Sequence, residues 1–143
     1  MDALPPEALL EAYPENIRAV ADRLRLLVAG AVPNSIERVR VGWRLIGYAV
    51  PFGRRTRYFA AIGPELRHCH LFFEYGAFMA DPERRLEGAH LRLKRVRYLT
   101  FTSRDGIAAI GGEAIQRYVV LAARLAMMSR EQRLAMSPGQ EIA

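Results

Sequence analysis

The spacing of the apolar residues changes abruptly near residue 33, and this change restricts the folds that the chain can adopt. Between residues 15 and 31 the apolar side chains recur three and four positions apart, at Ile17, Val20, Leu24, Leu27 and Ala31. This spacing predicts an amphipathic helix of about five turns. Between residues 36 and 62 the apolar period falls to two for most of the length, which is typical of strands.

Turn residues divide the middle of the chain into short strands. The Pro-Phe-Gly sequence at residues 51–53 predicts the turn of a hairpin. The expected strands lie, in chain order, at residues 39–46, 48–50, 56–62, 67–75 and 93–101. Because strands joined by short turns run in opposite directions, these segments predict an antiparallel meander.

Helical signals follow in two places. Asp81 as N-cap, Pro82 at the first helical position and Gly88 as C-cap predict a helical turn. A longer helix is expected at residues 112–128, with an apolar stripe at Ile115, Tyr118, Val119, Ala122 and Leu125. Beyond Ser129 the apolar pattern thins, so residues 129–143 are predicted to form a frayed tail.

These elements predict an α+β fold. We expect a two-layer sandwich in which an antiparallel sheet of about four to six strands packs against a long N-terminal helix and a C-terminal helix. Both helices are expected on one face of the sheet, which leaves the other face free. A single domain is expected over the 143 residues, with its core at about residues 13–128.

Composition narrows the range of partners. The net charge of +6 comes almost wholly from arginine, because Lys94 is the only lysine. The arginines are scattered and lack the interleaved aromatic residues of RNA-binding motifs, so nucleic acid is not an expected partner. The single cysteine, Cys69, cannot form an internal disulfide and is predicted to be a buried thiol.

The motifs of several protein classes are absent from the sequence. No signal-peptide pattern and no long apolar run is found, so a cytoplasmic protein without a membrane partner is expected. No Ser–His–Asp spacing, phosphate-binding loop or dinucleotide-binding fingerprint is present either. We therefore predict that the protein works by binding and is not an enzyme.

Two histidines suggest a metal site. His68 and His70 are two positions apart on a predicted strand, so their side chains should share one face, about 7 Å apart. Two imidazoles at that spacing can hold one iron or zinc ion, and His90 could add a third ligand if the fold brings it near. The alternative is that both histidines lie on a half-buried sheet face, hydrogen-bonded to their neighbours.

Aromatic residues on neighbouring strands suggest a different site. A pocket with aromatic walls and a few cationic groups suits a small anionic or planar ligand. The residues expected to line it are Trp43, Arg44, Tyr48, Tyr58, His70 and Tyr75. The alternative is that these aromatic residues belong to the core. If the free sheet face is apolar, a ligand, a protein partner or a second copy of the chain must cover it.

Several short motifs resemble those of the YdhG-like family of small bacterial domains. They fall within residues 13–127 and are Tyr13-Pro14-Glu15, Val32-Pro33, Phe59-Ala60-Ala61, Arg67-His68, Tyr75-Gly76-Ala77, Asp81-Pro82 and Leu86-Glu87-Gly88. The sequence departs from the family at Trp43-Arg44, where the family often has Met-Pro. It departs again at His90-Leu91, where the family usually has glycine and lysine.

The resemblance implies a frataxin-like α–β–α arrangement and, for some members, a role as an intracellular iron chaperone. Iron held by hard oxygen ligands would need clustered carboxylates, and Glu7, Glu11 and Glu15 are the N-terminal candidates. We therefore predict a non-catalytic module that binds a small ligand or a protein partner through the free sheet face. An intracellular metal carrier is the alternative function.

Overall fold

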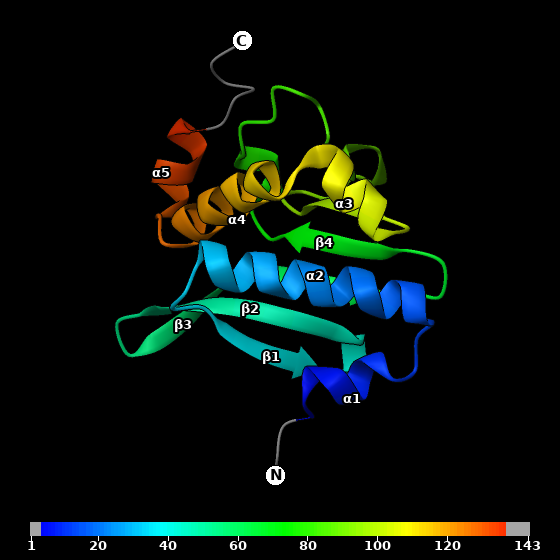
Figure 1. Cartoon of the computed structure of the whole chain (residues 1–143). Helices are drawn as coiled ribbons and strands as arrows, with labels where there is room; N and C mark the ends of the chain where they lie inside the picture. The colour runs from blue at the N-terminus through cyan, green and yellow to red at the C-terminus, as the bar shows by residue number, and fades with distance from the viewer. Residues whose placement is uncertain (1–3, 137–143) are drawn as a thin grey trace.

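Five strands form one antiparallel sheet, and each strand pairs with its neighbour in sequence. The computed structural model describes residues 4–136 (Figure 1). The strands are β1 (Ile36–Arg40), β2 (Leu45–Phe52), β3 (Arg55–Pro64), β4 (Cys69–Phe73) and β5 (Arg97–Phe101). The sheet order β1-β2-β3-β4-β5 confirms the predicted antiparallel meander.

Two long helices pack on the same face of this sheet. They are α2 (Glu15–Ala31) and α4 (Gly112–Ala126), which contact each other and strand β3. The shorter helices are α1 (Pro6–Leu10), α3 (Arg104–Ile110) and α5 (Arg130–Ala135). Figure 1 shows α2 lying across the sheet with α4 beside it. The predicted α+β two-layer sandwich is therefore confirmed.

The core lies between the sheet and these helices. A row of four aliphatic side chains crosses four paired strands, and each is at most 1% exposed: Ile46, Ile62, Leu71 and Leu99. The predicted apolar stripes of α2 and α4 pack against this row, and Leu24 and Ile115 in these stripes are fully buried. Burial of each such side chain contributes roughly 1.5–3 kcal/mol, so this row and its helical cover stabilise the sandwich.

The predicted strand at residues 39–46 is wrong, because a tight turn divides it. The short 3₁₀ helix η1 (Val41–Trp43) joins β1 to β2, and Arg44 follows with a left-handed backbone (φ 54°). The sequence alternates across this turn because Val41 and Trp43 are apolar, but they are 61% and 81% exposed. Val41 and Trp43 therefore stand where an alternating strand would have buried residues, but their side chains are exposed to solvent.

The segment between β4 and β5 contains less regular structure than predicted. Asp81 does cap a turn, since its carboxylate accepts hydrogen bonds from the backbone N–H groups of Arg85 and Leu86. The turn does not continue as a helix, because Arg84 has a left-handed backbone with φ 53°. Two short 3₁₀ helices, η2 (Gly76–Phe78) and η3 (Ala89–Leu91), also lie here, and β5 begins four residues later than predicted, at Arg97.

The predicted frayed tail after Ser129 is also partly wrong. Residues 130–135 form helix α5, which begins with a capping box between Ser129 and Gln132. The Arg133 guanidinium ties this helix to the end of α4 by donating to the carbonyl oxygens of Leu125 and Met128. Local polar contacts therefore hold a helix that apolar periodicity did not reveal. Residues 137–143 lie outside the described part of the chain.

None of the helices in the described residues is long and apolar enough to cross a membrane.

Candidate functional site

The sheet face away from α2 and α4 carries a line of ring side chains. His70 and Phe72 on β4 lie on this face, whereas Cys69, Leu71 and Phe73 point into the core. The His70 ring lies 4.6 Å from the His68 ring, 5.2 Å from Phe72 and 4.9 Å from Tyr98 on β5, measured between centroids. The prediction that His68 and His70 share one face is therefore confirmed.

Cys69 is a buried thiol, as predicted. Its side chain is fully buried, and burial raises its pKa to about 12. A thiol with such a pKa remains protonated at neutral pH and is a poor nucleophile. Cys69 thus belongs to the core and not to the site.

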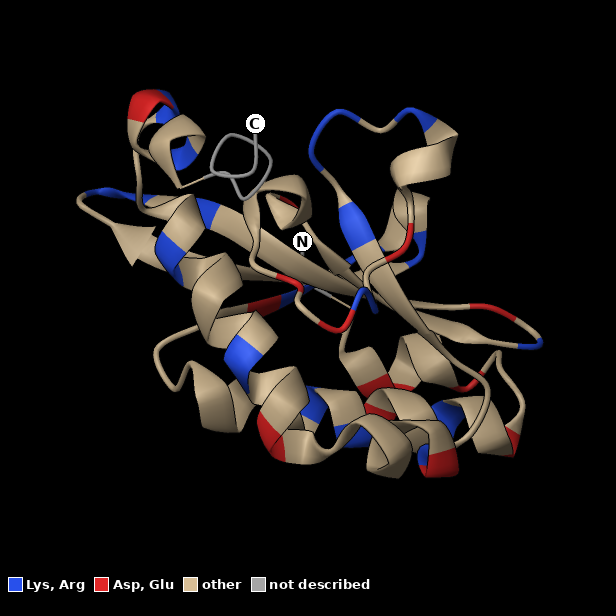
Figure 2. Ribbon diagram, turned by 90° about the horizontal axis from the view of Figure 1, so that it is seen from above, with Lys and Arg blue, Asp and Glu red and all other residues tan. Residues whose placement is uncertain are grey.

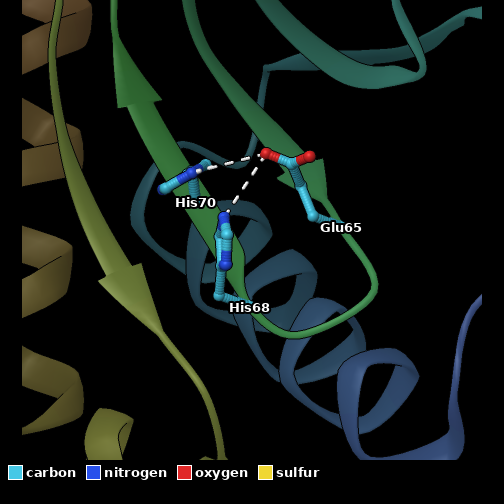
Figure 3. A group of neighbouring side chains, drawn as sticks. All are labelled: Glu65, His68 and His70. Carbon is cyan, nitrogen blue, oxygen red and sulfur yellow. Dashed lines mark ion pairs between the residues drawn. The ribbon is translucent and has the colours of Figure 1, made fainter.

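The turn between β3 and β4 brings a carboxylate to the two histidines. The Glu65 N–H donates to the His68 carbonyl at 2.8 Å, which closes a hairpin around Leu66 and Arg67. Glu65, His68 and His70 consequently lie on one face (Figure 3). Glu65 Oε2 is 3.4 Å from His68 Nε2 and 3.8 Å from His70 Nε2.

His70 is the most enclosed member of this cluster. Its side chain is 16% exposed, against 37% for His68 and 59% for Glu65. Its Nδ1 atom lies 3.0 Å from the Thr100 hydroxyl on β5. Burial lowers the pKa of His70, and the nearby His68 lowers it further.

A groove of about 520 Å³ opens beside this cluster. Its walls come from the η1 turn, the β3–β4 turn, the free sheet face and the connection between α1 and α2, and include Tyr13, Trp43, Arg44, Glu65, Leu66, His70 and Phe72. Gly63 lies directly opposite His70 in the sheet, and the Phe72 ring occupies the space that a side chain at residue 63 would need. The groove therefore combines exposed apolar surface with one arginine, one carboxylate and one imidazole.

The structure divides the predicted ligand-binding residues among different places. Trp43, Arg44 and His70 line the groove together. Tyr58 lines a separate cavity of only about 30 Å³, which also reaches Tyr48. Tyr75 packs elsewhere, with the Arg133 guanidinium 4.2 Å above its ring. The prediction of one common pocket is therefore wrong for these three tyrosines.

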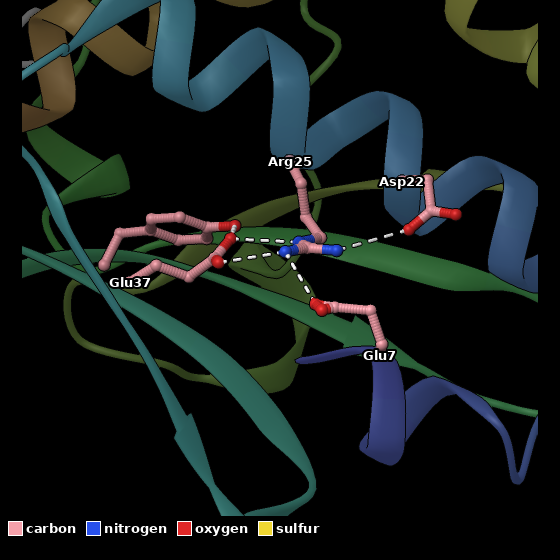
Figure 4. A network of polar contacts seen from close by, with 5 residues as sticks. Glu7, Asp22, Arg25 and Glu37 are labelled. Atoms are coloured by element: carbon pink, nitrogen blue, oxygen red, sulfur yellow. Dashed lines mark hydrogen bonds and ion pairs between the residues drawn. The ribbon is translucent and has the colours of Figure 1, made fainter. Parts of the chain in front are cut away.

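Tyr48 has a structural role that the sequence did not reveal. Its side chain is 2% exposed, and its hydroxyl donates to the Glu37 carboxylate at 2.6 Å. The Arg25 guanidinium of α2 donates to both oxygens of the same carboxylate and also pairs with Glu7 and Asp22 (Figure 4). Tyr48 thus joins the sheet to the helices.

Two of the predicted metal ligands are confirmed as neighbours and one is not. His68 and His70 form a cluster with Glu65, and His90 does not belong to it. His90 is exposed on η3, in the segment before β5. Within the described residues Glu7, Glu11 and Glu15 do not form the carboxylate group expected for hard oxygen ligation either, and Glu7 pairs with Arg25. The missed ligand, Glu65, had a detectable signal, since it directly follows the Gly63-Pro64 break and precedes His68 by three residues.

A second hollow, of about 390 Å³, lies between residues 80–85, the end of α3 and α4. Arg85, Arg117 and Tyr118 line it, and the Tyr118 hydroxyl donates to Asp81 at 2.6 Å. None of the predicted site residues lies there.

The positive charge is spread over the molecule. Figure 2 shows lysine and arginine on the helical layer as well as on the loops around the sheet. Within residues 4–136 the basic residues are therefore not confined to one layer of the sandwich.

Comparisons with known proteins leave the family open, since no family model, no curated protein and no solved structure matches this chain. The YdhG-like resemblance therefore stays a prediction.

Proposed function

We propose that this protein is a non-catalytic binding protein, and that the groove beside the β3–β4 turn holds a small planar anion. The observation that carries the proposal is the position of Trp43 and Arg44. An indole that is 81% exposed and an arginine follow each other on a tight turn and line the same groove. Aromatic surface beside a guanidinium is a suitable environment for a flat, negatively charged molecule.

The exposed indole supports this proposal energetically. Each 100 Å² of apolar surface that a ligand covers is worth about 2.5 kcal/mol, at roughly 25 cal/mol per Å². The Trp43 side chain is mostly in solvent, so the other described residues leave most of its apolar surface uncovered. A bound planar molecule would therefore gain stacking energy without displacing protein contacts.

The backbone at Arg44 fixes the direction in which the chain leaves the η1 turn. Arg44 has a left-handed conformation with φ 54°, directly at the groove wall. Such a conformation costs roughly 1–2 kcal/mol at a residue other than glycine. Arg84 and Arg92 share it and do not line the groove, so it positions Arg44 without by itself marking a binding site.

A homo-oligomer formed through the free sheet face, which was also predicted, has less support than a small ligand in the groove. Phe72 and Tyr98 are partly buried, and Gly63 and Ala61 on this face are buried. The apolar surface that would require a large partner is therefore limited, whereas a small ligand needs only the groove.

The predicted alternative is an iron carrier of the frataxin-like type, and the carboxylates of this chain support it less well. Such a carrier would gather exposed acids, but the Glu7 carboxylate is engaged by Arg25. The α–β–α order of elements is compatible with the resemblance to YdhG-like proteins. Of the functions that this resemblance implies, we propose only a binding role for this chain.

Fluorescence can test this function directly, because Trp43 is the single tryptophan. We expect a saturable change in its emission when planar carboxylates and phosphates are titrated, beginning with benzoate and adenosine monophosphate. Arg44→Gln should weaken binding at least about 10-fold, since a hydrogen bond to a charged group is worth about 1.5–3 kcal/mol.

Arg54→Gln is the matched control, because Arg54 is an exposed arginine in the turn between β2 and β3 and does not line the groove. It should bind as the wild type does. The proposal fails if no compound of this class changes the emission or the amide chemical shifts of the groove residues, or if both arginine variants bind alike.

A further inference from the structure

We infer that Glu65, His68 and His70 form a site for a divalent transition-metal ion at the edge of the groove. Among residues 4–136 they are the one group of three side chains with metal-ligand chemistry whose donor atoms all lie within 4.8 Å of one another. Two imidazoles and one carboxylate are a ligand set that zinc and ferrous iron accept, whereas calcium and magnesium prefer oxygen alone.

The distances fit one shared ion. Bonds of about 2.0–2.2 Å in tetrahedral geometry place ligand atoms roughly 3.3–3.6 Å apart. The two nitrogen-to-carboxylate separations, 3.4 Å to His68 and 3.8 Å to His70, are already close to this range. The remaining adjustment falls on His68 and Glu65, whose side chains are 37% and 59% exposed and can rotate.

A partner outside the ligand set orients the most enclosed histidine. Metal-bound imidazoles normally use their second nitrogen in a hydrogen bond that fixes the ring and its tautomer. The Thr100 hydroxyl lies 3.0 Å from His70 Nδ1, which leaves Nε2 facing Glu65. When Nδ1 carries the proton and donates it to Thr100, the Nε2 lone pair is free to bind the ion.

The site also has room for an external ligand. Three protein ligands leave at least one coordination position open, and Glu65 and His70 both line the groove with Arg44. A divalent ion with a single carboxylate keeps a net positive charge, which the arginine increases. This part of the inference rests on the proposed function: the groove ligand is an oxygen donor, such as a carboxylate, that binds the ion while its planar part contacts Trp43.

Cobalt provides the test, because its visible spectrum reports nitrogen and oxygen coordination. The full chain, treated with a chelator and dialysed, is titrated with Co²⁺ and in parallel with Zn²⁺ by calorimetry. We expect one ion per chain. Glu65→Gln should weaken binding by at least about 10-fold, and Thr100→Val, which leaves all three ligands in place, should weaken it roughly 10-fold.

His90→Ala is the matched control, since it removes a histidine that is not part of the cluster. It should bind metal as the wild type does, and circular dichroism confirms that each variant is folded. The inference is overturned if the wild type binds neither ion, if Glu65→Gln binds equally well, or if His90→Ala loses the ion. In those cases a Trp43 response to benzoate or adenosine monophosphate would leave the proposed function standing.

Oxalate then tests whether the bound ion accepts an external ligand, separately from metal binding itself. Added to the cobalt-loaded protein, it should shift the visible spectrum because it donates oxygen to the open position. An unchanged spectrum would show that the groove does not deliver ligands to the ion.

Discussion

The Tyr48 hydroxyl donates a 2.6 Å hydrogen bond to the Glu37 carboxylate, directly across the β1–β2 pair. The same carboxylate receives two hydrogen bonds from Arg25 of α2, at 3.0 and 3.1 Å. One acid therefore connects two strands with the helical layer. Its charge should matter for stability.

Acidification should weaken this connection. Burial alone would raise the pKa of Glu37, but the hydrogen bonds from Arg25 and Tyr48 outweigh burial and lower it. Because the folded pKa lies below the unfolded value of about 4.3, Glu37 stabilises the fold above that pH and loses this contribution as pH falls through the folded pKa. Urea unfolding between pH 7 and pH 3 should show Glu37→Gln to be about 1 kcal/mol less stable at pH 7, with the difference shrinking in acid. An equal difference at both pH values would contradict this account.

Gly76 should be nearly irreplaceable. A Cβ atom there would lie 2.5 Å from Arg97 Cβ and 2.8 Å from the Arg97 backbone nitrogen, so strand β5 would have to move. We expect Gly76→Ala to cost roughly 2–3 kcal/mol of unfolding free energy. Gly42→Ala is the control, because a Cβ at that position meets nothing within 4 Å. It should change stability by less than about 0.5 kcal/mol, and similar losses in both variants would show that backbone contact is not the cause.

The capping box should hold helix α5 in place. Ser129→Ala removes the side-chain acceptor for the Gln132 N–H, a loss of about 1 kcal/mol for a typical cap. Amide hydrogen exchange should therefore accelerate over residues 130–135. Ser103→Ala changes the N-cap of α3, where no side-chain capping bond is formed, and should leave exchange in α3 nearly unchanged. Unaltered exchange in α5 after Ser129→Ala would mean that Arg133 alone anchors the helix.

Trp43 should affect binding but not stability. Its side chain is 81% exposed, so Trp43→Ala removes almost no buried surface. We expect the urea midpoint to move by less than the equivalent of about 0.5 kcal/mol, while calorimetry shows weaker binding of planar anions. A large drop in stability would indicate that the indole packs against the protein and is not a contact surface for ligands.

Local periodicity was sufficient to predict the layers of this fold. The stripes containing Leu24 and Ile115 identify the two helices because the spacing of buried residues is a property of the helix itself. The hairpin between β2 and β3 was equally visible, because Gly53 supplies the positive φ that its turn needs. The turn itself lies at residues 53–54, later than the predicted 51–53, because Pro51 and Phe52 belong to β2. Such features depend on neighbours in sequence.

The site depended on register and exposure, which periodicity does not report. Glu65 meets His68 only because a two-residue turn places them opposite each other. Tyr48 and Tyr58 were predicted to line one pocket, but the irregularity between Tyr48 and Ala49 pairs Tyr58 with Ala49. The Tyr48 ring therefore reaches Glu37 on the helical side, whereas the Tyr58 ring lies beside Gly47. At the η1 turn, the exposed residues Val41 and Trp43 continue the alternating pattern of a strand, so the turn could not be recognised from the pattern.

The sheet order has a consequence for how the chain folds. Every strand pairs with its sequence neighbour, and the first three connections contain four, two and four residues, so these steps of sheet growth lose little chain entropy. The connection from β4 to β5 is longer, at residues 74–96. The long-range step is the docking of α4 on α2, since the eighty residues 32–111 separate these helices. Proteins dominated by local contacts fold quickly. The meander should therefore assemble early, and the arrival of α4 over the central strands should set the rate at which the native state forms.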